Sequence, residues 1–473
     1  MSALPLAERL QDAVGPIVVK EVRQGLRGRV FGIFFGLLLL ACLVMSLLAA
    51  AQVADSNGSE LGRDFLGAYL VAMGAVCYFV IPYTAFRSMV REREDETWVL
   101  LALTGLGARS IVRGKFASAM SQSLLYASAC APFVVFSYYL NGVDLVQVGL
   151  ALAMAFVWSA FLVALSVALG TLAETRLGRA VAHFVVLGLL AVGTGLAFTM
   201  SVALAQEGSS LVREDGFLAF CGAITLIAAG ATPVLLEGGA SCLSLPSENA
   251  AKGPRLAVTV YLAVGWLAAL GAAWLDKPSH DDAAAGSVAT SLVLVLVGLF
   301  AVSEEDGWPR STAKAGWLKP GALRSSMLVV VLLVLSTGVW LYVHERAGGL
   351  SDRRLYGLLA APLYPVCYLS AAAFFGRVTP LKRLGTAVGV RAAFAIVTGL
   401  GMVVPPVIAL LAGDRANDEE LNHLNPFFGL INFLTRNSHS ENRTGLVLLA
   451  SATVLFLVLG WIALAVQDKE RHA

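Results

Sequence analysis

The sequence predicts an all-α polytopic membrane protein, and both its composition and its long apolar segments indicate this fold class. Of the 473 residues, 58% are hydrophobic and only 14% are charged. Soluble domains are roughly 45–50% apolar and about 25% charged. The mean hydropathy is +0.76. Because this chain has too little charge for a water-exposed surface, we expect it to lie in a lipid bilayer. The formal net charge of +2 provides no basic surface for a nucleic acid.

Twelve segments are apolar over the length of about 20 residues that a membrane span needs. Backbone amides have no water to bond inside a bilayer, so segments of this length are expected to be helices. The predicted spans are 30–53, 65–86, 116–140, 146–172, 180–204, 217–236, 256–274, 283–302, 326–344, 356–375, 392–412 and 444–466. A further short apolar run at 425–431 predicts an interfacial or re-entrant helix between the last two spans.

The basic residues predict the orientation of these spans. With the N-terminus placed in the cytoplasm, 25 of the 34 Lys and Arg residues fall in inside segments and 9 fall in outside loops. This distribution follows the positive-inside rule. Both termini are therefore expected to be cytoplasmic, and the orientation of 413–443 depends on the span count being correct.

We expect neither an enzyme nor a metalloprotein. The sequence contains no HExxH, no G-x-S-x-G and no P-loop, so the chain has no ATPase motif of its own. Its six cysteines are scattered singly, which predicts neither a disulfide framework nor a zinc site. No acidic residue lies at the centre of a predicted span, with Glu237 coming closest. Secondary carriers usually need buried carboxylates for ion coupling, so this absence disfavours a secondary carrier.

Two segments outside the predicted spans carry chemical information. In residues 16–29, Val18, Val22 and Leu26 recur on one helical face, and basic residues lie on another. This pattern predicts an amphipathic helix in the headgroup plane, with an ordinary cytosolic tail as the alternative. The residues assigned to this interfacial helix are Lys20, Glu21, Arg23 and Arg27.

The loop at 87–115 joins a run of mixed charge to an apolar patch that is too short to span. Exposed aromatic residues beside charge are typical of partner surfaces, so we expect a docking helix for a cytosolic protein. The alternative is a solvated loop whose apolar end folds back onto the bilayer. The candidate docking residues are Glu92, Arg93, Glu94, Asp95, Thr97, Trp98 and Leu101.

Several short motifs resemble those of the membrane subunits of ABC-2 type exporters. The strongest part of the resemblance covers roughly residues 16–140, with weaker similarities further along the chain. It rests on Lys20-Glu21-Val22-Arg23-Gln24, on the Glu-Arg-Glu run with Thr97, Leu100, Leu101, Thr104 and Leu106, on Gly114-Lys115, on Ser247-Glu248-Asn249 with Arg255, and on Asn425-Pro426-Phe427. Members often carry Gly before the Thr, whereas this chain has Asp95-Glu96.

The resemblance implies a permease subunit in a bacterial cytoplasmic (inner) membrane. It also implies a separate ABC ATP-binding subunit that docks on the loop and holds the Mg-ATP, while this chain binds no cofactor. A homodimer or heterodimer of permease chains is compatible with the family. In this scheme residues 1–29 are the connecting helix, 30–236 the first six spans with the coupling loop 87–115, 237–255 a cytoplasmic linker, and 256–473 the second six spans.

Two questions stay open at the level of sequence. Ser121, Gln122 and Tyr126 form the most polar stretch of the third predicted span. They are candidates for a substrate path, and interhelical hydrogen bonding explains them equally well. The expected function is export of an amphipathic or lipid-linked molecule, and the alternative is a membrane scaffold that recruits a cytosolic protein without transport.

Overall fold

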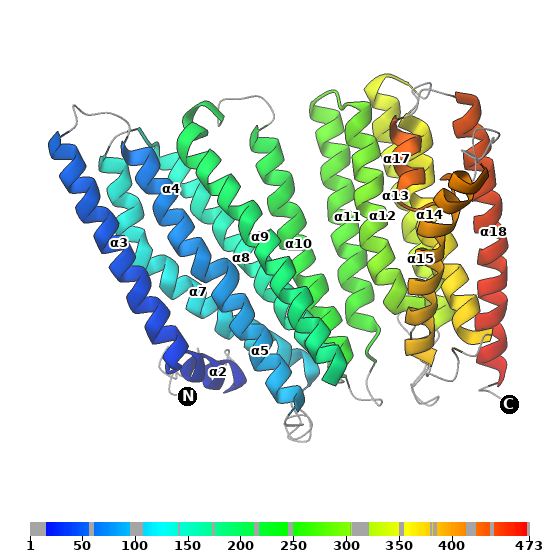
Figure 1. Ribbon diagram of the computed structural model, residues 1–473, viewed down its shortest axis with the longest axis horizontal. Coiled ribbons are helices and arrows are strands. Elements are labelled where there is room, and N and C mark those ends of the chain that lie inside the picture. Colours follow the sequence, from blue (N-terminus) through cyan, green and yellow to red (C-terminus); the bar gives the residue numbers. More distant parts are fainter. Residues whose placement is uncertain are drawn as a thin grey trace, which may run out of the picture. The chain divides into compact units, whose positions relative to one another are not determined.

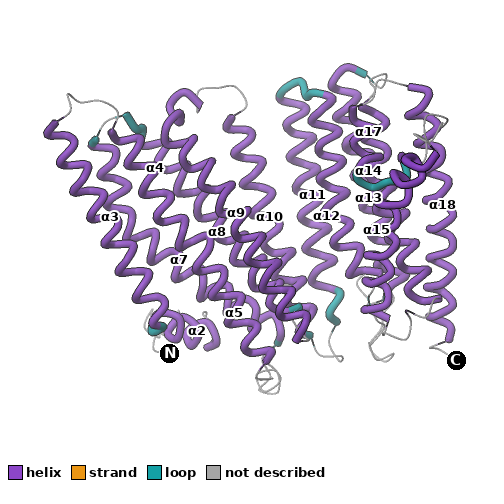
Figure 2. The backbone as a smooth tube through the Cα atoms, viewed as in Figure 1, coloured by secondary structure: helices purple, strands orange, loops and turns teal. Residues whose placement is uncertain are grey.

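A computed structural model describes most of the chain, and its described part is helical without strands (Figure 2). The described residues are 16–55, 61–94, 107–140, 142–172, 176–211, 217–244, 249–302, 304, 321–349, 354–378, 381, 386–412, 422–435 and 439–470. Within these ranges, twelve helices are long and apolar enough to cross a membrane. Each overlaps one predicted span, so the prediction of a polytopic helical membrane protein is confirmed.

The chain divides into two compact units, Met1–Leu245 and Pro246–Ala473. The division falls inside the segment 237–255 that the sequence marks as a linker. Helix α10 nevertheless continues to Leu243 and α11 begins at Lys252, so helix occupies much of that segment. The two units are described separately below.

In its described residues, unit 1 contains seven α-helices and a π-helical turn, followed by α10 (Figure 1). Helices α4, η1 and α5 together form one continuous span. The elements are α2 (Pro16–Leu26), α3 (Arg29–Asp55), α4 (Leu61–Gly74), η1 (Ala75–Val80), α5 (Ile81–Glu94), α7 (Ala108–Tyr139), α8 (Leu145–Thr171), α9 (Arg176–Leu211) and α10 (Phe217–Leu243).

The core of unit 1 is built from large side chains of the second, third and fourth spans. Tyr69, Phe86, Met89, Tyr126 and Leu162 are all fully buried there. Packing of this kind holds helices together in a bilayer, where lipid tails are as apolar as leucine and burial of apolar surface adds little.

The π-helical turn η1 interrupts the second span at its buried centre. Its last backbone bond runs from the Ile81 N–H to the Val76 carbonyl, five residues back. A π-turn leaves a carbonyl without its usual partner, and the Ser159 hydroxyl on α8 donates to the Cys77 carbonyl at 3.1 Å. The neighbouring helix therefore satisfies the irregular backbone, as a bilayer requires.

Unit 2 is arranged around its most buried span, α14, which packs against α12, α13, α15, α17 and α18. Its elements are α11 (Lys252–Leu275), α12 (His280–Val302), α13 (Ala322–Gly348), α14 (Arg354–Val378), α15 (Thr386–Ala412), α17 (Phe428–Thr435) and α18 (His439–Glu470). Helices α14 and α18 approach closely because Gly460 has no side chain. A Cβ atom at that position would lie 2.8 Å from the Ser370 carbonyl oxygen.

The short apolar run predicted at 425–431 forms the helix α17, eight residues long and shifted toward the C-terminus. Asn425 starts it, because its side-chain Oδ1 accepts hydrogen bonds from the N–H groups of Phe427 and Phe428 at 2.9 and 3.0 Å. Two hydroxyls from α14 fix the preceding turn. Tyr364 donates to the His423 carbonyl at 2.6 Å and Tyr368 to the Leu424 carbonyl at 2.7 Å.

The Gly460 contact leads to a stability prediction. Gly460→Leu forces α14 and α18 apart, and overpacking of this kind costs about 1–3 kcal/mol. The expected result is unfolding at a lower SDS fraction, followed by helical circular dichroism in mixed micelles. Gly338→Leu on α13 is the matched control, since nothing lies within 4 Å of a Cβ atom there. Equal unfolding curves for the two variants would contradict the packing account.

Candidate functional site at the charged end of unit 1

A buried lysine joins three helices at the end of unit 1 where α7 begins. Lys115 is 4% exposed. Its Nζ lies 2.7 Å from Glu92 Oε1 on α5 and 3.3 Å from Glu21 Oε2 on α2. It also donates to the Ser88 hydroxyl at 2.7 Å. One cation thus connects α7 to both α5 and the N-terminal amphipathic helix. We call Lys115, Glu21, Glu92 and Ser88 the lysine cluster.

The amphipathic helix α2 reaches this position because it packs closely across α7 (Figure 1). Gly25 makes the approach possible, since a Cβ atom there would lie 2.5 Å from Gln122 Nε2 and 3.3 Å from Ser118 Oγ. Lys20, Arg23 and Arg27 are exposed. Glu21 points the other way and pairs with Lys115. The helix therefore places one carboxylate inward and its cations outward.

Burial decides how strong the lysine cluster is. Exposed ion pairs contribute about 0–1 kcal/mol, whereas removing one member of a buried pair costs about 3–5 kcal/mol because it strands the other charge. Lys115 has 3% of its side chain exposed, with Glu21 at 12% and Glu92 at 18%. Two carboxylates surround one ammonium, so loss of the lysine leaves two poorly hydrated negative charges close together.

Three further ion pairs connect helices at the same end of unit 1. Arg109 Nε and Arg113 Nη2, one turn apart on α7, each lie 2.8 Å from a different oxygen of Glu237 on α10. Arg179 Nε on α9 lies 3.2 Å from Glu94 Oε1 on α5. Both arginines of α7 are largely exposed, so these pairs contribute less to stability than the lysine cluster does.

These contacts involve residues near both ends of the segment 87–115 that is predicted to dock a partner. Its first part continues helix α5 as far as Glu94, and its last part is the start of α7, which begins at Ala108. Of its candidate residues, Glu92 joins the lysine cluster and Glu94 pairs with Arg179. The backbone of Arg93 is helical. Asp95, Thr97, Trp98 and Leu101 lie outside the described residues.

The predicted substrate-path residues make contacts between and within helices. The Tyr126 hydroxyl donates to the Phe31 carbonyl of α3 at 2.8 Å, and the side chain is 1% exposed. Ser121 donates to the Ala117 carbonyl of its own helix at 2.8 Å, and Gln122 lies against Gly25. Their role in a path stays a prediction, and the contacts of Tyr126 are those of an interhelical tether.

The sequence did not identify the partners of two of these charges. In the sequence, Gly114-Lys115 stands out only as part of a family motif, and Glu237 only as the acidic residue nearest a span centre. The sequence does show a lysine at the start of an apolar span, with acidic residues in the amphipathic segment 16–29 and in the segment 87–115. Pairing it with Glu21 and Glu92 requires the helix packing, which periodicity does not provide.

Among the described residues, no group of three or more His, Cys, Asp and Glu side chains is placed to hold a metal ion. The charged end of unit 1 is an array of ion pairs between helices. No family model, no curated protein and no solved structure matches this chain.

The lysine cluster yields a second prediction. Lys115→Met leaves Glu21 and Glu92 without their cation and lowers the free energy of unfolding by about 3–5 kcal/mol. SDS titration of the purified chain measures this change. Lys20→Met, at an exposed position of α2, is the control and shifts stability by about 0.5 kcal/mol or less.

Adding Glu92→Gln to Lys115→Met removes one of the two stranded charges. We therefore expect the double variant to recover part of the lost stability. The effects of two substitutions on the free energy of unfolding do not add when the residues are in contact. A double variant no more stable than Lys115→Met would show that the two side chains do not interact.

Proposed function

We propose that this chain is the membrane-spanning permease subunit of an ATP-driven exporter of the ABC-2 type. A separate ATP-binding subunit docks on the coupling segment 87–115 and provides the energy. The transported molecule is amphipathic or lipid-linked, and it moves outward across a bacterial cytoplasmic membrane. The observation that carries the proposal is that ion pairs join both ends of this loop to neighbouring helices of unit 1.

A docking loop can do mechanical work only if its flanking helices are stiffly connected to the rest of the bundle. On the upstream side, Glu92 and Glu94 connect α5 to α7 and α9. On the downstream side, Arg109 and Arg113 connect α7 to α10. Through Lys115, α2 is joined to both flanks. Displacement of the loop by a partner would therefore reach five helices, which is what an externally driven permease needs.

The same features support a second candidate, a scaffold that recruits a cytosolic protein without transport. It needs the docking loop and its rigid base, and it needs no nucleotide. The distinction is functional, because a permease stimulates ATP hydrolysis by its partner when substrate is present and a scaffold does not.

The docking test uses two substitutions in the loop. Trp98→Asp with Leu101→Asp places charge on the apolar patch, and desolvating a charge at an interface centre is unfavourable. We expect the ATP-binding subunit to be lost on co-purification in mild detergent, while the permease stays inserted. Tyr139→Asp is the control, because that side chain is 74% exposed at the other end of α7. Unchanged co-purification of the loop variant would refute the docking assignment.

The predicted orientation has its own test. Single cysteines replacing Asp418 and Lys469 are exposed to a membrane-impermeant maleimide from each side in turn. Position 418 should react only from outside and position 469 only from the cytoplasm. Background labelling is low, because five native cysteines are buried and Cys242 is partly buried. Labelling of position 418 from the cytoplasm alone would reverse the assigned direction of the last two spans.

A further inference from the structure

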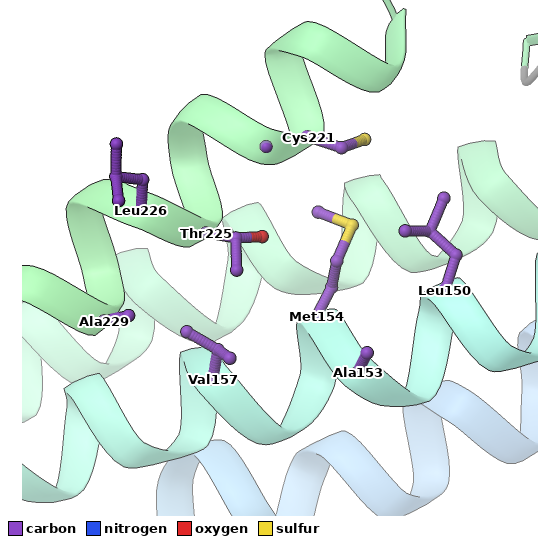
Figure 3. A pocket seen from close by; sticks show the side chains of 9 residues that line it. Leu150, Ala153, Met154, Val157, Cys221, Thr225, Leu226 and Ala229 are labelled. Atoms are coloured by element: carbon purple, nitrogen blue, oxygen red, sulfur yellow. The ribbon is translucent and has the colours of Figure 1, made fainter. Parts of the chain in front are cut away.

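An apolar groove lies between α8 and α10 in unit 1. Its volume is about 450 Å³ and it is open on one side, a size within the range of ligand pockets, roughly 300–1,000 Å³. Leu150, Met154 and Val157 line it from α8, and Cys221, Thr225 and Ala229 line it from α10. Figure 3 shows Met154 and Thr225 facing each other across it. Both sets recur at helical spacing, so each forms one face of its helix.

The depth of the groove places it among hydrocarbon chains. Helix α8 begins at Leu145, and with a rise of 1.5 Å per residue the groove runs from about 8 to about 18 Å along it. Because α7 leads away from the lysine cluster before α8 turns back, this is the half of unit 1 opposite that cluster. On the predicted orientation it is the outer leaflet.

The chemistry of the lining selects the occupant. The lining residues carry no charge, and their polar groups are the Thr225 hydroxyl and the Cys221 thiol. Water in such a site would lack the two to four polar partners that it needs. A lipid headgroup would have no charge to bind. A hydrocarbon chain instead gains dispersion contacts along both walls.

We propose that this groove binds one acyl chain of a bilayer phospholipid, held between α8 and α10 as a retained lipid. Gly222 leaves space for the chain in the groove because it has no side chain. Nothing lies within 4 Å of a Cβ atom built there, and the residue itself lines the groove. Gly222→Leu therefore fills the space that the acyl chain would occupy, without displacing the protein backbone. The assignment of this site does not rest on the transport proposed above.

The test uses the full chain in phosphatidylcholine vesicles that contain a trace of photoreactive phosphatidylcholine. One probe carries a diazirine in the middle of an acyl chain, and a second carries it on the headgroup. After illumination, mass spectrometry maps the labelled peptides. The mid-chain probe should label 150–157 and 221–229 above the other lipid-exposed segments, and the headgroup probe should not.

Gly222→Leu should lower the mid-chain labelling of these peptides at least about tenfold, equivalent to about 1.4 kcal/mol of lost binding. Gly188→Leu on α9 is the matched control, since it also has open space at Cβ and does not line the groove. Its labelling should equal that of the unmodified chain. Ala153→Leu fills the groove from the α8 side and serves if Gly222→Leu elutes aggregated.

Three results would overturn the proposal. The first is even labelling of all exposed helices, which means that the lipid is only annular. The second is undiminished labelling in both groove-filling variants. The third is an absence of mid-chain labelling at 150–157 and 221–229 while other lipid-exposed helices are labelled, which means that protein covers the groove.

Discussion

The absence of hydrogen-bonding solvent inside the bilayer is the constraint on which this architecture depends. Backbone groups must be satisfied within each span, and charges must lie where they can be paired or hydrated. Unit 1 meets both requirements locally. The π-turn in the second span has its freed carbonyl bonded by Ser159, and the buried Lys115 is surrounded by two carboxylates and a hydroxyl. An unpaired carbonyl or a buried charge is tolerated where a neighbouring helix provides its hydrogen-bond or ionic partner.

The same constraint explains why the ion pairs gather at helix ends. Helices α5, α7 and α10 all extend past the apolar segments that define their spans, ending or starting at Glu94, Ala108 and Leu243. These extra turns carry the residues that form salt bridges between helices. Where several helices project together, their charges are close enough to pair and partly shielded from water, so the projecting ends form one connected structure.

Much of the fold could be predicted from the sequence because length and hydrophobicity alone decide which segments span a bilayer. The sequence also predicts the short helix near 425–431, which in the structure spans Phe428–Thr435 because Asn425 caps its start. The π-turn could not be predicted, because nothing in the apolar sequence Ala75–Val80 distinguishes it from the rest of its span. Nor could the lysine cluster, because Glu21 and Lys115 are 94 residues apart and meet only where Gly25 lets α2 approach α7.

Helix α10 links the two features of unit 1 that we propose to be functional. Its first turns form one wall of the groove, and Glu237 near its other end binds Arg109 and Arg113. Pro233 lies between them within the helix, and proline removes a backbone hydrogen bond and favours a bend at that point. If the proposed partner acts through α7, it pulls the Glu237 end directly, while the groove end stays packed on α8. The expected motion is bending of α10 at Pro233, and a lipid chain that stiffens the α8 contact concentrates the bend there.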